Sequence, residues 1–389
     1  MMRGLRRLAP RALACIGGGT LVAISLQQTS AALADSMQIK PAFTFGVISD
    51  VQWADADDGF NYARTVRRCF RGALQTLRVA VSWWNTLSPH PDFVAQLGDL
   101  IDGRNAGLGT SMSAMAQASA LLEGAPCRVY NLVGNHELYN FDRAHLGDVL
   151  EVAPRPTRSE FHAFSPAPGW RVLALDSFQE SVIGWPKDDP RHVRAQRMLA
   201  ENNPNINPSD PGANGNWLVG IKGLRRRFVP YNGALGERQL EWLRGELEAA
   251  EREGQRVVIL SHAILHPQAC DGSTMVWDYA AALKAIRRSG CVVAVVCGHD
   301  HAGGVHRDQS GVLHLTLCSP LNKGAEGHAY GLLQFYDDRV ELLGPRLADL
   351  LPLTQAERHG GVVLGEVQRQ GVRCEAVRFP GIAARATRP

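Results

Sequence analysis

Val129-Tyr-Asn-Leu-Val-Gly-Asn-His-Glu137 joins a short apolar run to a cluster of polar side chains, and the rest of the fold can be built outward from this junction. A short apolar run of this kind predicts a buried strand. Four further runs predict strands and end in similar clusters of Asp, Gln or His: residues 43–49, 93–97, 256–260 and 291–297. Ligands bind beyond the carboxyl ends of strands in α/β sheets, so the five clusters are expected to meet at one site.

The segments between these strands predict helices. Four of them have helical spacing or are rich in helix-forming residues: 62–84, 111–122, 237–253 and 279–288. Further strands are predicted at 171–175, 312–317, 331–336 and 340–343. Strands that alternate with helices favour an α/β fold in which the helices cover the sheets.

The composition is that of an ordinary globular protein. The chain has 389 residues, of which 45% are hydrophobic and 20% charged, which excludes a disordered, collagen-like or coiled-coil protein. The net charge of +3 is too small to indicate a nucleic-acid or membrane-surface partner. The eight cysteines form no Cys-x-x-Cys pair and several lie in apolar runs, so we expect buried free thiols.

Both ends of the chain and one internal segment differ from the rest. Residues 1–40 place several arginines before an apolar run, which is typical of a secretory signal or an organelle transit peptide. A disordered extension, and with it a cytoplasmic protein, is the alternative. The apolar run is shorter than the ~20 residues of a membrane span, so no stable membrane insertion is expected. The main domain is expected at 41–346, with an irregular insertion at 180–227 and a C-terminal tail at 347–389 that is at best partly ordered.

The five clusters form a recognisable series. In chain order they read Asp50-Val-Gln52, Gly98-Asp99-Leu-Ile-Asp102, Gly134-Asn-His-Glu137, His262 and Gly298-His-Asp-His301. This series resembles the signature of the calcineurin-like metallophosphoesterases, over residues 43–344. The resemblance implies a layered β-sandwich flanked by helices in α/β/β/α order. It also implies two divalent metal ions, which clamp a phosphoryl group and activate a water molecule.

The resemblance also implies a role for each residue of the clusters. One ion would be held by Asp50, Gln52, Asp99 and His301, and the other by Asp99, Asn135, His262 and His299. His136 would face the phosphate, where it stabilises charge or protonates the leaving oxygen. Asp102 would orient that imidazole by a hydrogen bond, with a helix N-cap as its alternative role. With the site filled, His266, His306 and His328 are not expected to bind metal.

Gln52 narrows the resemblance to one branch, because most of the superfamily has histidine at this position. An amide oxygen favours Mn²⁺, although Mg²⁺, Fe and Zn²⁺ stay open. The stretches at 50–62, 228–233 and 262–267 also resemble the manganese-dependent ADP-ribose/CDP-alcohol diphosphatases. That branch implies hydrolysis of ADP-ribose, CDP-choline or a similar nucleotide to a nucleoside monophosphate and a phosphomonoester. The alternatives are a phosphomonoesterase, a cyclic-nucleotide phosphodiesterase and a non-catalytic scaffold.

Five residues are candidates for binding a small nucleotide diphosphate substrate. Tyr62 occupies the branch's base-stacking position, with a core aromatic as the alternative. Arg64 and Arg68, expected on one helix, would reach the non-scissile phosphate or lie on a solvated face. Thr274 and Leu218 are expected to line the base pocket. The stretch at 314–324 departs from the acidic stretch expected there, which leaves the choice of substrate open.

Overall fold

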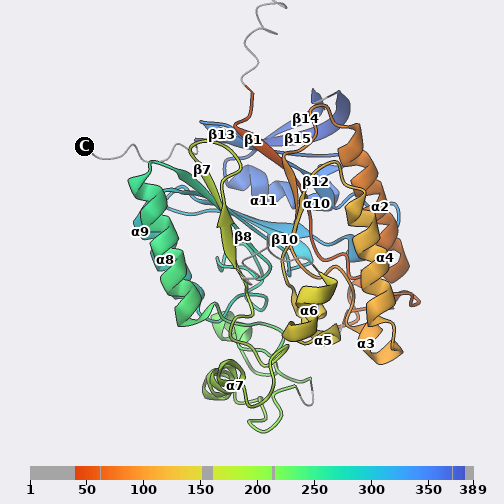
Figure 1. The fold of residues 1–389 in the computed structure, drawn as a ribbon, viewed down its shortest axis with the longest axis vertical. Coiled ribbons are helices and arrows are strands. Elements are labelled where there is room, and N and C mark those ends of the chain that lie inside the picture. Colours follow the sequence, from red (N-terminus) through yellow and green to blue (C-terminus); the bar gives the residue numbers. More distant parts are fainter. Residues whose placement is uncertain (1–39, 62, 151–160, 213–214, 370, 382–389) are drawn as a thin grey trace, which may run out of the picture. The chain divides into compact units, whose positions relative to one another are not determined.

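The fold is that of a computed structural model, which describes residues 40–61, 63–150, 161–212, 215–369 and 371–381 (Figure 1). The predicted targeting segment, apart from Lys40, lies outside the described residues, and so does Tyr62. No helix among the described residues is long and apolar enough to span a membrane.

One of the two large sheets has seven strands. In spatial order they are β14 (Val362–Arg369), β15 (Val372–Pro380), β13 (Arg339–Gly344), β12 (Tyr330–Phe335), β1 (Phe43–Ile48), β4 (Phe93–Gln96) and β5 (Val129–Asn131). The last three are parallel neighbours, with Phe45 opposite Phe93 and Val94 opposite Val129. Their carboxyl ends therefore lie at one edge of this sheet.

The second large sheet has six strands. In spatial order they are β10 (Ala302–Arg307), β11 (Leu313–Cys318), β9 (Val292–Cys297), β8 (Arg256–Ser261), β7 (Trp170–Ala174) and β6 (His162–Phe164). The four central strands run parallel, and β8 and β9 pair with Ser261 opposite Cys297. The two strands that are followed by the histidine clusters are thus direct neighbours.

Hydrophobic clusters show how the sheets and helices are layered. One core lies between the two sheets and combines side chains such as Phe45 and Phe93 with Val258 and Leu315. A second core packs α2 (Phe70–Thr86) and α4 (Ser111–Glu123) on the seven-stranded sheet. A third packs α8 (Gly236–Arg252) and α9 (Tyr279–Ser289) on the six-stranded sheet. Figure 1 shows these helix pairs on opposite sides, so the predicted α/β/β/α order is confirmed.

The remaining elements lie outside the two large sheets and the four helices that cover them. A two-stranded sheet joins β2 (Gly59–Phe60) to β3 (Arg67–Arg68). The remaining helices are α3 (Arg104–Leu108), α5 (Asn135–Asn140), α6 (Arg143–Val149), α7 (Pro190–Asn202), α10 (Leu347–Leu350) and α11 (Leu353–Arg358), with 3₁₀ turns η1 (Gly223–Arg227) and η2 (Pro320–Asn322).

The predicted helix at 62–84 was wrong at its start, because α2 begins only at Phe70. The side-chain oxygen of Asn61 accepts hydrogen bonds from the backbone N–H groups of Thr65 and Val66, at 2.8 and 3.1 Å. Such local bonds compete with helical ones and hold the chain in a turn. Arg64 and Arg68 therefore do not share a helix: Arg64 lies in the turn and Arg68 in β3.

Two segments contain more regular structure than the sequence predicted. The insertion at 180–227 includes α7, which Asp189 caps by accepting from the N–H of Arg191, with Pro190 in the first turn. The supposed tail forms α10, α11 and two strands, of which β15 pairs with β13 in continuous register. In β15, Cys374 and Ala376 pack into the core beneath α2 and α4, and Val377 and Phe379 pack into the core between the sheets, so this strand is buried on both faces although Arg373 is exposed.

The cysteines of the described residues are all free thiols. Cys291, Cys297, Cys318 and Cys374 are buried as predicted, whereas Cys69, Cys127 and Cys270 are half-buried. Cys15 lies outside the described residues.

Candidate metal centre

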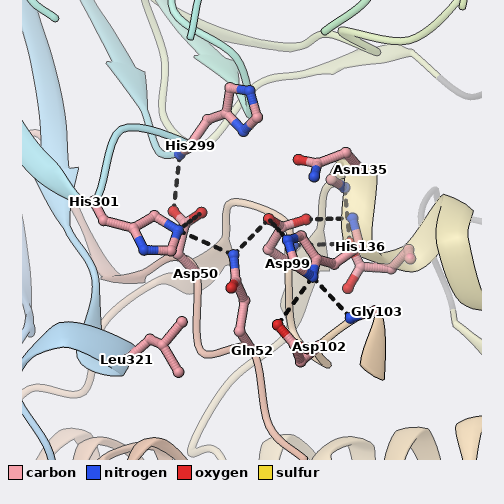
Figure 2. A network of polar contacts seen from close by, with 12 residues as sticks. Asp50, Gln52, Asp99, Asp102, Gly103, Asn135, His136, His299, His301 and Leu321 are labelled. Atoms are coloured by element: carbon pink, nitrogen blue, oxygen red, sulfur yellow. Dashed lines mark hydrogen bonds and ion pairs between the residues drawn. The ribbon is translucent and has the colours of Figure 1, made fainter. Parts of the chain in front are cut away.

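The five polar clusters converge at the carboxyl ends of strands from both large sheets. Figure 2 labels residues of every cluster except His262. Asp50 and Asp99 follow β1 and β4, and Asn135 opens α5 just beyond β5. His262 directly follows β8, while His299 follows β9. Side chains from two different sheets therefore face one another.

Much of the site stands on unusual backbone. Four of its non-glycine residues have left-handed conformations: Asp50 (φ 54°), Gln52 (φ 47°), Asp99 (φ 58°) and His299 (φ 67°). Backbone of this kind costs roughly 1–3 kcal/mol per residue and is concentrated at functional sites. It is held by hydrogen bonds from the N–H of Asp50 to the carbonyl of Gly98 (3.0 Å) and from that of Gln52 to the carbonyl of Asp99 (2.8 Å).

The first half of the centre contains Asp50, Gln52 and His301. Asp50 Oδ2 accepts from Ser49 Oγ (2.6 Å) and from the N–H of His299 (2.9 Å), which leaves Oδ1 free. His301 Nε2 lies 3.4 Å from that Oδ1 and 3.0 Å from Gln52 Nε2. Asp50 Oδ1 and Gln52 Oε1 are buried without a hydrogen-bond partner. A half-turn of the Gln52 amide would exchange its nitrogen and oxygen and place Oε1 beside His301. Asp50 Oδ1 and Gln52 Oε1 therefore suit the binding of a cation.

The second half surrounds His262, which is fully buried. Its Nδ1 donates to the carbonyl of Leu97 (2.8 Å), which leaves Nε2 as the basic nitrogen. This Nε2 lies 3.1 Å from His299 Nδ1, 3.3 Å from Asn135 Oδ1 and 3.5 Å from Asp99 Oδ2. Two imidazole nitrogens, an amide oxygen and a carboxylate form a donor set that fits a first-row divalent ion.

Asp99 lies between the two halves (Figure 2). Its Oδ2 accepts from Gln52 Nε2 (2.9 Å) and its Oδ1 accepts from the N–H of His136 (2.8 Å). Burial alone would raise the pKa of Asp99, but the adjacent His262 and His136 hold it well below its ordinary value. Glu137, to which the sequence assigned no role, fixes this loop by accepting from the N–H groups of Asp99 (2.8 Å) and Leu100 (2.6 Å).

His136 lies beside the centre rather than in it, with Nε2 3.8 Å from Asp99 Oδ2. Its Nδ1 lies 2.8 Å from the N–H of Gly103 and 3.2 Å from Asp102 Oδ2. The amide can donate only to an unprotonated Nδ1, and the carboxylate accepts only from a protonated one. The two contacts thus serve two protonation states of one imidazole. Burial opposes protonation, but Asp99 and Asp102 raise the pKa of His136.

The N-cap role for Asp102 was wrong, because Gly103 is the N-cap residue of α3, and the role of Asp102 in orienting His136 stays a prediction. Its Oδ2 faces His136, while its Oδ1 accepts from the N–H of Arg104 (2.9 Å) at the start of α3.

The expected substrate residues are placed unevenly. Arg68 is half-buried, and its Nε has no hydrogen-bond partner. Burial lowers the pKa of Arg68, and the negative charges of Asp102 and Asp99 oppose this shift, so its guanidinium interacts electrostatically with carboxylates of the centre. Arg64 is exposed with φ 56°. Thr274 and Leu218 are half-buried.

A second group of buried donors, His266, Asp308 and His314, lies away from this centre. A cation of the chain already occupies it: Arg287 Nη2 lies 3.2 Å from His266 Nε2 and its Nε 3.3 Å from Asp308 Oδ2. The expectation that His266, His306 and His328 bind no metal stays a prediction.

Comparison with known proteins agrees with this arrangement. The family model of calcineurin-like phosphoesterases matches residues 43–303. A crystal structure of a dimetal phosphatase from Danio rerio superimposes with a TM-score of 0.73 at 36% identity, over 78% of this chain and 96% of that one. The chain belongs to the calcineurin-like phosphoesterase family.

Full-length relatives narrow the family further. Proteins named manganese-dependent ADP-ribose/CDP-alcohol diphosphatase are 37% identical in Danio rerio, over 81% of this chain and 98% of the relative, and 35% identical in Homo sapiens, over 80% and 92%. One from Arabidopsis thaliana is 34% identical, over 78% and 94%. Within its family, the chain belongs to the manganese-dependent ADP-ribose/CDP-alcohol diphosphatases.

Proposed function

We propose that this protein hydrolyses the diphosphate bond of ADP-ribose, CDP-choline and related nucleotides, to a nucleoside monophosphate and a phosphomonoester. The observation that carries the proposal is the buried convergence of carboxylate, amide and imidazole donors from two sheets. The alignments with relatives that are named for this activity cover nearly the whole length of each relative.

Two divalent ions fit the centre. Asp50, Gln52 and His301 would hold one, Asn135, His262 and His299 the other, and Asp99 both. When bound, the ions supply positive charge for the phosphate oxygens and lower the pKa of the attacking water. Gln52 supports Mn²⁺ because an amide oxygen is a harder ligand than the imidazole that it replaces.

The chain's own side chains have three further tasks. Arg68 carries a positive charge that interacts with Asp99 and Asp102, which suits it to bind the phosphate that is not attacked. His136 holds a proton at the edge of the centre and can pass it to the leaving oxygen. Asp102 keeps the ring of His136 in place and favours its protonated form.

The central test is a substrate panel with protein stripped of metal and reloaded with Mn²⁺. ADP-ribose, CDP-choline, cyclic AMP and p-nitrophenyl phosphate are assayed side by side for product release. We expect fast Mn²⁺-dependent release of AMP or CMP, which Asp99→Asn abolishes. Asp308→Asn is the matched control, because it changes a buried carboxylate beside histidines outside the centre. Activity on cyclic AMP or the monoester alone would refute the substrate assignment, and loaded but inactive protein would favour a scaffold.

The role of Arg68 has its own test against its neighbour. Arg68→Ala should lower kcat/KM for ADP-ribose by about tenfold or more, in line with about 1.5–3 kcal/mol for a charged hydrogen bond. Arg67→Ala removes an exposed arginine that pairs with Asp58 at 2.7 Å, and should leave kcat/KM unchanged. Equal effects of the two variants would contradict the role of Arg68.

A further inference from the structure

Asn232 is a buried amide that touches the metal centre from outside. It lies in the loop between η1 and α8 and is fully inaccessible to solvent. Its Oδ1 lies 2.7 Å from Nε2 of His299. Its Nδ2 lies 2.8 Å from the carbonyl oxygen of Arg227 and 2.8 Å from that of Ser273.

These contacts determine which way round the amide lies. Both backbone carbonyls can only accept hydrogen bonds, so the amide group that faces them must be the NH₂. The oxygen is then left for His299 and can only accept. The ring of His299 must therefore carry its proton on Nε2, and the lone pair is on Nδ1, which faces His262 Nε2 at 3.1 Å.

We propose that Asn232 is the positioning residue that fixes His299 as an Nδ1 ligand of the second metal ion. The inference rests on the proposed function only in taking His299 as a ligand. The amide cannot turn over, because a reversed Asn232 would point its oxygen at two carbonyls and its NH₂ at a protonated ring nitrogen. The two backbone carbonyls thus set the tautomer of His299 through one side chain.

The same contacts tie the metal centre to two loops. The carbonyl of Arg227 ends the insertion that contains Leu218, and Ser273 directly precedes Thr274. Both candidate base-pocket residues thus belong to segments that Asn232 links to His299. Loss of the Asn232 amide should therefore weaken both the binding of metal at His299 and the anchoring of these two loops.

The test uses the full chain and compares three variants with the parent by titration of metal-free protein with Mn²⁺, with free Mn²⁺ measured by electron paramagnetic resonance. Asn232→Leu should bind one of the two ions, the one held by His299, about 10- to 100-fold less tightly, the usual effect of losing a ligand's outer partner. Asn232→Asp keeps an acceptor for His299 but turns its second oxygen toward the carbonyls of Arg227 and Ser273, so it should lower the melting temperature while losing less Mn²⁺ affinity than Asn232→Leu.

Asn203→Leu is the matched control. Asn203 is a buried amide in the 180–227 insertion, and its Nδ2 also donates to two carbonyls, those of Trp217 (3.0 Å) and Phe228 (2.7 Å). We expect it to lower the melting temperature but leave Mn²⁺ affinity unchanged. Parent-like binding by folded Asn232→Leu, or an equal loss of affinity in Asn203→Leu, would overturn the proposal.

A measurement on the unaltered protein covers the case in which Asn232→Leu does not fold. Long-range ¹H–¹⁵N spectra of the histidine rings in metal-free protein should show His299 as its Nε2–H tautomer, and the Nδ1–H tautomer would contradict the inference. The two proposals can fail separately. Parent protein that binds two Mn²⁺ but leaves ADP-ribose intact would refute the proposed function and leave the role of Asn232 to be judged on affinity alone.

Discussion

Mn²⁺ affinity should rise steeply with pH, because one of the expected ligands must lose a proton to bind. Burial alone would lower the pKa of His262, but the carboxylates of Asp99 and Asp50 raise it to about 9 in the metal-free protein. Burial and the neighbouring His262 lower the pKa of His299 to about 3, so His299 needs no deprotonation. When a proton competes with the metal for a ligand of pKa 9, the apparent affinity falls by a factor of 1 + 10^(9 − pH). This predicts about an 80-fold gain in affinity between pH 6.5 and 8.5.

The contribution of His262 to the stability of the metal-free protein should change in the opposite sense and fall as the pH rises. A histidine whose pKa is raised on folding stabilises the fold below its ordinary pKa of 6.5, and this contribution is lost as the pH rises through about 9. A shift from 6.5 to about 9 corresponds to about 3 kcal/mol at most. Mn²⁺ therefore has its largest stabilising effect at the pH where the contribution of His262 to the stability of the metal-free protein is lost.

The assay is a Mn²⁺ titration at pH 6.5, 7.5 and 8.5, combined with calorimetry in two buffers of different ionisation enthalpy to count released protons. We expect close to one proton released per second ion at pH 7.5. His262→Gln, which has no titrating ring, should lose most of the pH dependence. An affinity that changes less than about threefold over this range, with no proton released, would refute the reasoning.

Three further predictions concern the surroundings of the site and the stability of the fold. A Cβ at Gly134 would overlap the carboxylate of Asp99, so Gly134→Ala should weaken Mn²⁺ binding tenfold or more in the same titration. Burial and then Arg128 lower the pKa of His162 to about 4, so stability is lost as the pH falls from 6.5 toward 4. In urea denaturation, the free energy of unfolding of His162→Phe relative to that of the parent should be about 2 kcal/mol higher at pH 5 than at pH 7.5. Arg143→Met leaves the buried carboxylate of Asp176, which lies 2.8 Å from Arg143, without its positive partner. The free energy of unfolding in urea should fall by about 3–5 kcal/mol.

The first of these predictions has a matched control, and the other two have outcomes that would contradict them. Gly147→Ala adds a Cβ that meets nothing within 4 Å and should leave metal binding unchanged. A pH-independent effect of His162→Phe would contradict its neutral burial. If Arg143→Met costs under about 1 kcal/mol, the ion pair would be no more important than a surface pair.

The sequence was most informative where an apolar run stops abruptly at a polar cluster. Asp50, Asp99 and His262 could be located because a buried strand needs continuous apolar residues, so its end is visible as a change of composition. That the ends meet followed from the parallel arrangement of α/β sheets. The same reasoning could not decide the start of α2, since the turn at Asn61 depends on a side-chain hydrogen bond that has no apolar period.

Other features depend on contacts between distant segments. The arginines of β15 favoured a loop, because the burial of both faces of this strand depends on cores formed by distant segments and on its pairing with β13. Asn232 stands in a loop without periodicity, and its role requires three partners from three places in the chain. Only the quoted stretch at 228–233, which resembles its branch, could have drawn attention to it.

The division of the expected ligands between the two sheets links metal binding to the fold itself. Asp50 and Asp99 follow strands of one sheet, and His262 and His299 follow strands of the other. Two ionised carboxylates are almost fully buried where these sheet ends meet, a placement that is costly unless positive charge compensates it. In the metal-free protein a protonated His262 supplies part of that charge, and divalent ions would supply more. The left-handed backbone at these residues adds to the cost. The polar centre is therefore held in place by the apolar core between the sheets, and metal ions that bridge the sheet ends would in turn strengthen their association.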